Sequence, residues 1–202
     1  MAAHAPAEVR RDQVLNAALK CFARNGYHAT RVDDIVAEAG LSKGAIYHRF
    51  RSKDEIFLGL FDAYEAAVWH AWEALPEANA LDMLEAVGHI VLETVVEPRE
   101  YLRLWKELLA HPAAPERFSH IYAESRTQLT TLLERGVRRQ ELNAMDVSAV
   151  AALLTATIEG LLLQALMDER FDAPTAWRAG WPAMRSGLER REKRPARREH
   201  GR

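Results

Sequence analysis

Apolar residues recur at helical spacing along nearly the whole chain. Near the start they stand three or four positions apart, as on one face of an α-helix, at Val14, Ala17, Ala18, Cys21 and Phe22. The pair Asn25-Gly26 predicts the end of this helix, because glycine readily adopts the left-handed conformation that closes helices. A second run with the same period, 32–39, ends at Gly40. No segment alternates apolar and polar residues beside hairpin signals, so the sequence predicts an all-α fold.

Turn and capping residues divide the rest of the chain into further helices. A very short third helix is predicted from Ser42, and a fourth runs from a capping box of Ser52 and Glu55 to Pro76. Prolines and polar clusters then separate five more predicted helices, at 80–96, 98–110, 116–140, 147–168 and 174–190. About nine helices are therefore expected, and Pro182 is expected to kink or split the last one.

Composition indicates a soluble globular protein. Hydrophobic residues make up 49% of the 202 positions, and the single cysteine, Cys21, excludes an intrachain disulfide. The N-terminus lacks the apolar core of a secretory signal. The segment 147–167 approaches membrane-spanning length, but it carries Glu159 near its centre, where an acidic residue would be costly in a bilayer. We expect this helix to be buried in protein, with no membrane partner and a cytoplasmic location.

The net charge of −2 conceals an uneven distribution. Residues 1–53 carry a net charge of +4, residues 54–180 carry −11, and residues 181–202 carry +5. A basic beginning ahead of an acidic body predicts two functions on one chain, the first directed at a polyanion. The acidic excess either favours cationic ligands or keeps that part of the chain away from DNA. The basic tail is interpreted as disordered and solvated in preference to contacting DNA.

The segment 43–51 has two distinct faces when projected on a helix. Ile46 and Phe50 share the side expected to be buried. The opposite side carries Gly44, Tyr47, His48 and Arg51, flanked by Lys43 and Arg49. Such groups suit phosphates and base edges, although an ordinary amphipathic surface helix has a similar pattern. The preceding helix and the turn at Gly40 favour a helix-turn-helix, whose second helix enters the major groove of DNA.

The stretch 30–57 resembles the signature of the TetR (tetracycline repressor) family of transcriptional regulators. The matching positions are Thr30, Asp34, Ile35, Ala39, Gly40, Ser42, Gly44, Ile46, Tyr47, Phe50, Ser52 and Lys53. Two positions depart from the pattern, since Val36 replaces the usual alanine and Arg49 stands where the family commonly has His or Tyr. The resemblance covers about a quarter of the chain. It implies an N-terminal three-helix DNA-binding domain and a C-terminal helical domain for ligand binding and dimerisation.

The same resemblance assigns roles within the motif. Thr30 is expected to cap the first helix of the motif and to contact a phosphate. Tyr47 and Lys53 are also expected to contact phosphates, whereas Lys43 and His48 are expected to lie nearer base edges. For Lys53, a solvated residue in the first turn of a helix is the alternative. The complete expected DNA-binding set is Thr30, Ser42, Lys43, Gly44, Ala45, Tyr47, His48, Arg49 and Lys53.

Three divisions of the chain follow. Residues 1–52 are expected to form the helix-turn-helix domain, 53–190 the effector-binding and dimerisation domain, and 191–202 a basic disordered tail. Candidate residues for the effector pocket are Trp69, His89, Trp105, Phe118 and Tyr122, although core packing is the alternative for each. Their aromatic character predicts an apolar or aromatic small-molecule effector.

The helix predicted at 147–168 is apolar on nearly all sides, so it must be covered on two sides. The simplest second cover is another subunit, and a bundle of two helices from each copy is how TetR-like proteins dimerise. The expected interface residues are Leu154, Ile158, Leu161, Leu162, Trp177, Trp181 and Met184. Glu159 is interpreted as an interface carboxylate, with a role as an effector ligand as the alternative.

No motif of an enzyme, cofactor site or metal site is present. The sequence lacks a phosphate-binding glycine loop, H-E-x-x-H, C-x-x-C and a nucleophile-elbow serine. We therefore expect no catalysis, no cofactor and no metal. The function predicted is a homodimeric, ligand-responsive repressor that binds a palindromic operator in double-stranded DNA. The alternative is a helical dimeric ligand-binding or scaffold module without sequence-specific DNA binding.

Overall fold

The structure is a computed structural model that describes residues 7–96 and 99–190. Within these ranges it is all-α, as predicted, and the helix count of nine is confirmed. The helices are α1 (Ala7–Asn25), α2 (Val32–Ala39), α3 (Lys43–Tyr47), α4 (Lys53–Glu73), α5 (Ala80–Val96), α6 (Arg99–Leu109), α7 (Ala114–Arg138), α8 (Val147–Met167) and α9 (Ala173–Leu188). The basic tail predicted at 191–202 lies outside the described residues.

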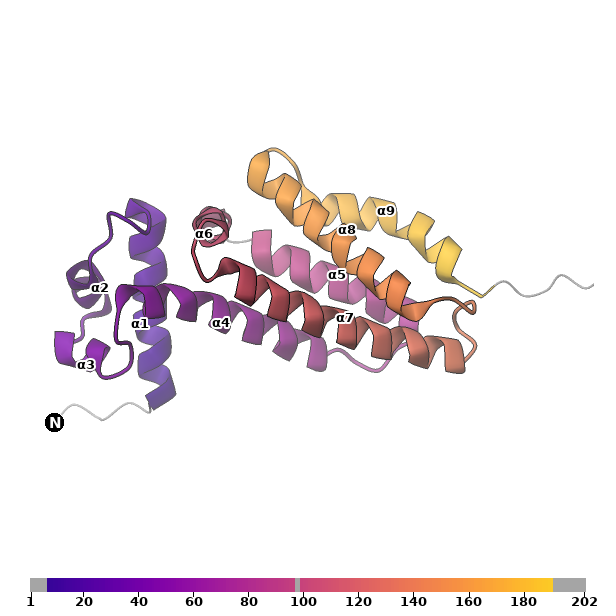
Figure 1. Ribbon diagram of the computed structural model, residues 1–202, viewed down its shortest axis with the longest axis horizontal. Helices are drawn as coiled ribbons and strands as arrows, with labels where there is room; N and C mark the ends of the chain where they lie inside the picture. The colour runs from indigo at the N-terminus through magenta and orange to yellow at the C-terminus, as the bar shows by residue number, and fades with distance from the viewer. Residues whose placement is uncertain (1–6, 97–98, 191–202) are drawn as a thin grey trace, which may run out of the picture.

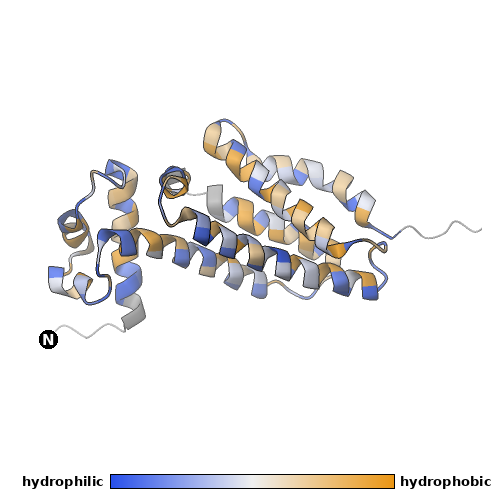
Figure 2. Ribbon diagram, in the orientation of Figure 1, coloured by the Kyte–Doolittle hydropathy of each residue, from blue (hydrophilic) through white to orange (hydrophobic). Residues whose placement is uncertain are grey.

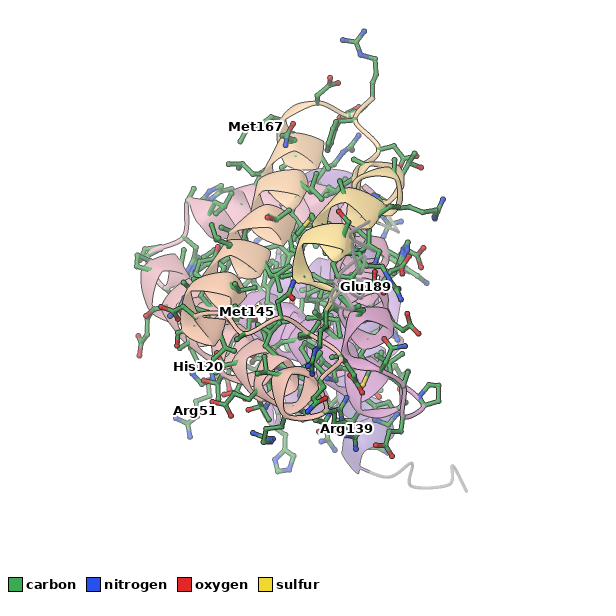
Figure 3. All side chains as sticks on the ribbon, turned by 90° about the vertical axis from the view of Figure 1, so that its right-hand side faces the viewer. Arg51, His120, Arg139, Met145, Met167 and Glu189 are labelled. Atoms are coloured by element: carbon green, nitrogen blue, oxygen red, sulfur yellow. The ribbon has the colours of Figure 1, made fainter. Side chains whose placement is uncertain are left out.

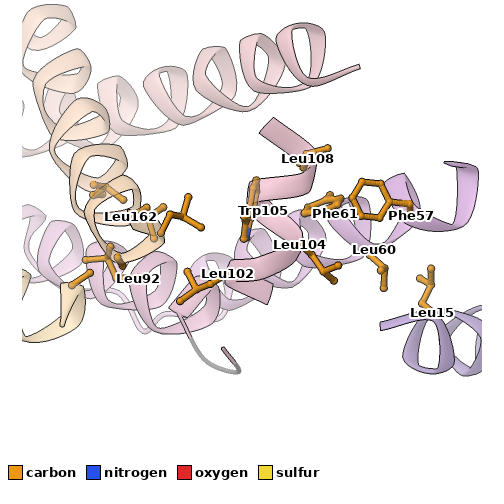
Figure 4. Close-up of a cluster of buried hydrophobic side chains, with 14 of the residues drawn as sticks. Leu15, Phe57, Leu60, Phe61, Leu92, Leu102, Leu104, Trp105, Leu108 and Leu162 are labelled. Carbon is orange, nitrogen blue, oxygen red and sulfur yellow. The ribbon is translucent and has the colours of Figure 1, made fainter. Parts of the chain in front are cut away.

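Two groups of helices are joined by the long helix α4. Figure 1 shows α1, α2 and α3 together at one end, with α4 running from them along the helices of the other group. Helix α4 packs against both α1 and α5, and α6 packs against both α1 and α8. The hydrophobic core is continuous between the two groups of helices, from Leu15 through Phe57 and Phe61 to Trp105 and Leu162 (Figure 4). The two groups therefore share one set of packed side chains where they meet.

Local rules set the helix ends near the first group. Gly26 and Gly40 have φ values of 78° and 63°, the left-handed conformation expected where α1 and α2 stop. The hydroxyl of Ser52 accepts a hydrogen bond from the backbone N–H of Glu55 at 3.1 Å, and the Glu55 carboxylate accepts one from the N–H of Arg51. The predicted capping box at the start of α4 is thereby confirmed, except that the Glu55 carboxylate binds the N–H of Arg51 and not that of Ser52.

The expectation that Pro182 splits the last helix is wrong. Helix α9 continues from Ala173 to Leu188 with Pro182 inside it. The side chain is exposed, so the ring lies on the solvent side of the helix, where water can satisfy a carbonyl that loses its partner. The end of α9 is also held by the loop before α8, because the Asn143 N–H donates to the Leu188 carbonyl at 3.0 Å.

Helix α8 has one buried face and one exposed apolar face. By length and composition it is the one helix in the described ranges that could cross a membrane, but it packs against α5, α6, α7 and α9. The outer face carries Leu153, Leu163 and Met167, which are 67%, 49% and 69% exposed. Figure 2 shows the apolar colouring of α8 along its length, and Figure 3 shows Met167 labelled near one end of it.

Most of the residues predicted for the dimer interface lie on the inner faces of α8 and α9. Leu154, Ile158, Leu162, Trp177 and Trp181 are all buried in the core of their own chain, and only Leu161 and Met184 are partly exposed. The predicted set is therefore a poor description of any surface between copies. The error arises because a helix that is apolar on all sides shows no periodicity that separates its core face from its outer face.

Replacing Gly88 with alanine is expected to destabilise the protein by about 1–3 kcal/mol, since a Cβ atom there would lie 2.1 Å from the ring of buried Trp177. This clash outweighs the gain of about 1 kcal/mol in helix propensity. Gly44→Ala is the matched control, because no atom lies within 4 Å of its added Cβ. Urea unfolding of both variants measures the difference; equal stability of the two would contradict the tight packing of α5 on α9.

Candidate nucleic-acid interface and effector cavity

Two side chains fix the orientation of α3. Ile46 and Phe50 are 0% and 4% exposed, as the helical projection predicted, and the Arg11 guanidinium lies 6.0 Å from the centre of the Phe50 ring. The Ser42 hydroxyl caps the helix by accepting the N–H of Ala45 at 3.2 Å. A helix of only five residues would be unstable alone, so these anchors hold its outer face in place.

The outer face of α3 brings together most of the predicted DNA-binding residues. Ser42, Lys43, Gly44, Tyr47 and His48 are exposed, whereas Ala45 and Arg49 are partly exposed. Tyr47 is 44% exposed, which is unusual for so large an aromatic side chain in the absence of a partner. We call the exposed group the α3 face; it combines a cation, an imidazole, hydroxyls and a bare backbone position.

Lys43 is held across the motif by Asp33 of α2. The Lys43 Nζ lies 2.7 Å from the Asp33 Oδ1, and both side chains are more than half exposed. The ammonium group holds the pKa of Asp33 below its usual range. An exposed ion pair contributes little free energy, so Lys43 can exchange this carboxylate for a phosphate or a base edge at small cost. The charge of Arg31, absent from the predicted set, acts on the same pair.

The structure gives Thr30 and Lys53 roles other than those predicted. Thr30 is 1% exposed, and its hydroxyl lies 2.7 Å from the Gly26 carbonyl oxygen, while Arg31 occupies the N-cap of α2. Thr30 therefore does not cap α2, and a buried hydroxyl cannot reach a phosphate. The Lys53 ammonium donates to the carbonyls of residues 27, 28 and 30 at 2.7, 3.3 and 3.0 Å, which uses all three of its donors. Both residues instead fix the loop before α2.

Helix α6 contacts this same loop through Glu107. The Glu107 carboxylate accepts the backbone N–H of Tyr27 at 2.8 Å, and burial raises the pKa of Glu107. The Tyr27 ring packs on Phe57 of α4 with 4.5 Å between ring centres. Loop, α4 and α6 therefore form one contact region, which we call the junction.

A cavity of about 320 Å³ lies on the other side of α6. It falls within the size range of small-molecule sites. Its walls come from α6, α7 and α8, and the lining residues are Trp105, Leu109, Phe118, Tyr122, Glu159, Gly160, Leu162, Leu163 and Leu166. Phe118 lies 5.7 Å from both Trp105 and Tyr122, measured between ring centres. The cavity thus joins an aromatic wall to an apolar stretch of α8.

Glu159 is the one carboxylate in the cavity lining. It makes a side-chain hydrogen bond with Tyr122, and burial raises its pKa. Burial and the nearby carboxylate also raise the pKa of Tyr122. The sequence interpretation placed Glu159 at a dimer interface; the structure places it in the cavity wall instead. An acidic residue inside an otherwise apolar helix was the available sequence signal.

Three of the five predicted pocket residues line this cavity, namely Trp105, Phe118 and Tyr122. The other two lie elsewhere. Trp69 of α4 packs beside Trp72 with ring centres 5.5 Å apart, and His89 of α5 lies 3.8 Å from Glu93. Residue type alone suggested both, and neither α4 nor α5 contributes a residue to the lining of this cavity. Among the described residues, no group of three His, Cys, Asp or Glu side chains is suited to hold a metal ion.

An anchored helix-turn-helix joined by α4 to a helical domain with a ligand-sized cavity defines a ligand-responsive DNA-binding regulator. Comparison with known proteins agrees. Residues 14–60 match the model for bacterial regulatory proteins of the tetR family, and residues 80–180 match the C-terminal model for BetI-type transcriptional repressors. The chain belongs to the TetR family of bacterial transcriptional regulators, whose general role is ligand-responsive repression.

Individual relatives support the same assignment. The HTH-type transcriptional regulator TtgR of Pseudomonas putida is 28% identical over 177 residues, covering 80% of this chain and 82% of that protein. An HTH-type transcriptional repressor of Mycobacterium tuberculosis is 45% identical over 138 residues, covering 65% of this chain and 66% of that protein. A solved transcriptional regulator from Saccharomonospora viridis, in complex with choline, has a TM-score of 0.74 at 24% identity, covering 92% of this chain and all of that one.

Proposed function

We propose that the protein is a homodimeric repressor that binds an inverted-repeat operator through the α3 face and is released by a small molecule in the α6–α8 cavity. Residues 1–52 would bind DNA, and 53–190 would bind the effector and the second copy. The protein acts by binding, without catalysis, in the cytoplasm. The observation that carries the proposal is the α3 face, an exposed polar surface anchored from behind by Ile46 and Phe50.

The DNA-contacting set follows from exposure. Of the residues predicted from the sequence, we retain Ser42, Lys43, Gly44, Ala45, Tyr47, His48 and Arg49, and we add Arg31 and Arg51, which are exposed beside them. Thr30 and Lys53 become positioning residues, because both are bound to the loop that precedes α2. Cations on this face would neutralise phosphates, so binding should weaken steeply as salt is raised.

The outer face of α8 supports dimerisation. Residues on this face are spaced alternately four and three positions apart, the spacing typical of two helices that pack side by side. They are Ala149, Leu153, Ala156, Gly160, Leu163 and Met167. We call this row the α8 seam. The exposed positions of neighbouring α9 include Ala179, Gly180, Ala183 and Ser186, whose small side chains allow close approach. A two-fold pairing here would present two α3 helices to successive turns of DNA, roughly 34–36 Å apart.

The route from cavity to DNA-binding helices runs through α6. Trp105 lines the cavity, and Glu107, two residues further along, binds the loop between α1 and α2. Trp105 also packs on Phe61 of α4, with 5.0 Å between ring centres. A ligand that displaces Trp105 would shift the junction and α4, and thereby the spacing of the two α3 helices. Such a ligand acts only through different affinities for the two arrangements.

The cavity supports the predicted apolar or aromatic effector in part. Its aromatic wall and four leucines would bury an apolar body. The structural neighbour from Saccharomonospora viridis is in complex with choline, which supports ligand binding by this type of helical domain. The likeness to that neighbour is one of fold, so the effector of this chain is determined by its own lining residues.

Selection of bound sequences from a random DNA pool, followed by mobility shifts at increasing salt, tests the proposal. We expect a symmetric consensus and a steep loss of affinity with salt. An asymmetric consensus would remove the two-fold dimer. Absence of any retardation at low salt would favour the alternative, a dimeric ligand-binding or scaffold module.

A further inference from the structure

We propose that the effector of this protein is an organic cation, whose charged group pairs with Glu159 while its apolar body lies against Trp105 and Phe118. This inference rests on the proposed function, since it concerns the same cavity, and it narrows the class of ligand.

Glu159 is the one acidic group in the cavity wall. Glu159 is partly buried in a cavity whose other lining residues are aromatic, leucine or glycine. In the described ranges 7–96 and 99–190, no Lys, Arg or His forms an ion pair with Glu159. Its hydrogen-bond partner is the neutral hydroxyl of Tyr122. A carboxylate in an apolar wall without a counter-charge is costly, and a bound cation removes that cost.

Three aromatic rings form one wall of the cavity. The rings of Trp105, Phe118 and Tyr122 follow one another along the cavity, with tilts of 38° and 31° between successive planes. The negative faces of aromatic rings attract ammonium groups, most strongly at desolvated sites. One cavity therefore combines both recognised means of holding an organic cation, a carboxylate and aromatic faces. An anionic effector would meet repulsion from Glu159 and receive no compensating cation from the lining.

Calorimetry with matched probes tests the inference. We would use three amine and alcohol pairs at neutral pH: 2-phenylethylamine with 2-phenylethanol, cyclohexylmethylamine with cyclohexylmethanol, and hexylamine with hexanol. For each pair, the carboxylate with the same hydrocarbon group serves as the anionic probe. We expect the ammonium form to bind at least about tenfold more tightly than the alcohol in at least one pair, and the carboxylates to bind most weakly.

Glu159→Gln is the decisive variant. The amide keeps the size of the side chain and a hydrogen bond to Tyr122 but removes the charge, so the preference for ammonium over alcohol should fall to about twofold or less. Glu134→Gln, which removes an exposed carboxylate of α7 outside the cavity lining, should leave the preference unchanged. A preference that survives in Glu159→Gln, equal or tighter binding of alcohols, or no binding of any ammonium probe would overturn the inference.

A pH titration of the unmodified protein gives a second measurement in case the variant does not fold. Glu159 and Tyr122 are the titratable residues of the lining, α6 contributing only Trp105 and Leu109. Burial raises the pKa of Tyr122, so its hydroxyl stays protonated, and burial also raises the pKa of Glu159 above its ordinary value. Ammonium affinity should fall as pH is lowered through that raised pKa, and alcohol affinity should not change. Parallel losses for both probes would contradict a charge on Glu159.

Mobility shifts separate this inference from the proposed function. Cation binding by a protein that retards no DNA would leave the inference standing and remove the repressor. DNA that is retarded by the protein and released by alcohols but not by ammonium probes would support the repressor and overturn the inference.

Discussion

The double variant Lys43→Ala/Tyr47→Ala is expected to lose operator affinity by about 100-fold or more at physiological salt. Each residue should contribute about 1–3 kcal/mol, Lys43 through a base edge or phosphate and Tyr47 through a phosphate. The structure explains why the loss would be specific. Ile46 and Phe50, which anchor α3, remain in place, and both replaced side chains are exposed. Circular dichroism should therefore show unchanged helix content.

Lys20→Ala is the matched control for charge. Lys20 also forms an exposed ion pair, with Glu38 at 3.5 Å, but it lies on α1 away from the α3 face. Its replacement removes the same charge and should change affinity far less. The salt dependence of binding supplies a second reading, because loss of a cation that contacts phosphate lowers the slope of log affinity against log salt by about one per site. Unchanged operator affinity in a folded double variant would remove the α3 face from the DNA interface.

Most of the fold could be predicted from local sequence rules. Helix ends at Gly26 and Gly40 follow from a backbone conformation that glycine adopts without strain, and the start of α4 follows from Ser52 and Glu55. The two faces of α3 follow from helical period alone. These features depend on residues within one or two turns of each other, which is the range over which sequence patterns are informative.

The errors concern contacts between segments far apart in the chain. Lys53 is bound by carbonyls 23 to 26 positions earlier, and nothing in its own helix indicates that partner. A phosphate contact was therefore the natural expectation at a helix N-terminus. The cavity has the same character: residue type identified Trp105 and Tyr122, but only the packing of α6, α7 and α8 brings Glu159 beside them.

Most residues predicted for the dimer interface are buried within their own chain, and on α8 this arises because the helix has two apolar faces. Leu154 and Ile158 follow the helical period of a core face, and they do pack into the core. Leu153 and Met167 belong to a second row with a period of three and a half, which a strictly apolar helix conceals. Only their exposures of 67% and 69% distinguish the α8 seam from the core.

Leu153→Glu is expected to convert the protein to a monomer. The substitution places one carboxylate from each copy in the middle of the α8 seam, where two charges would be desolvated against apolar side chains. Because Leu153 is mostly exposed within one chain, the monomer should keep its helices and its cavity. Light scattering measures the mass. Operator affinity should fall by about 100- to 10,000-fold, since two linked contacts are reduced to one.

Ala67→Glu introduces the same carboxylate at an exposed apolar position of α4, outside both α8 and the cavity lining. This control should remain a dimer, so a change of mass specific to Leu153→Glu identifies the seam itself. Retention of ammonium binding by the monomer would show that the cavity is complete within one chain. A Leu153→Glu protein that still elutes as a dimer would place the pairing surface elsewhere, and the exposed heptad row of α8 would then be without a partner. Operator binding and mass are expected to fall together, because a single α3 helix has too few contacts to hold an operator alone.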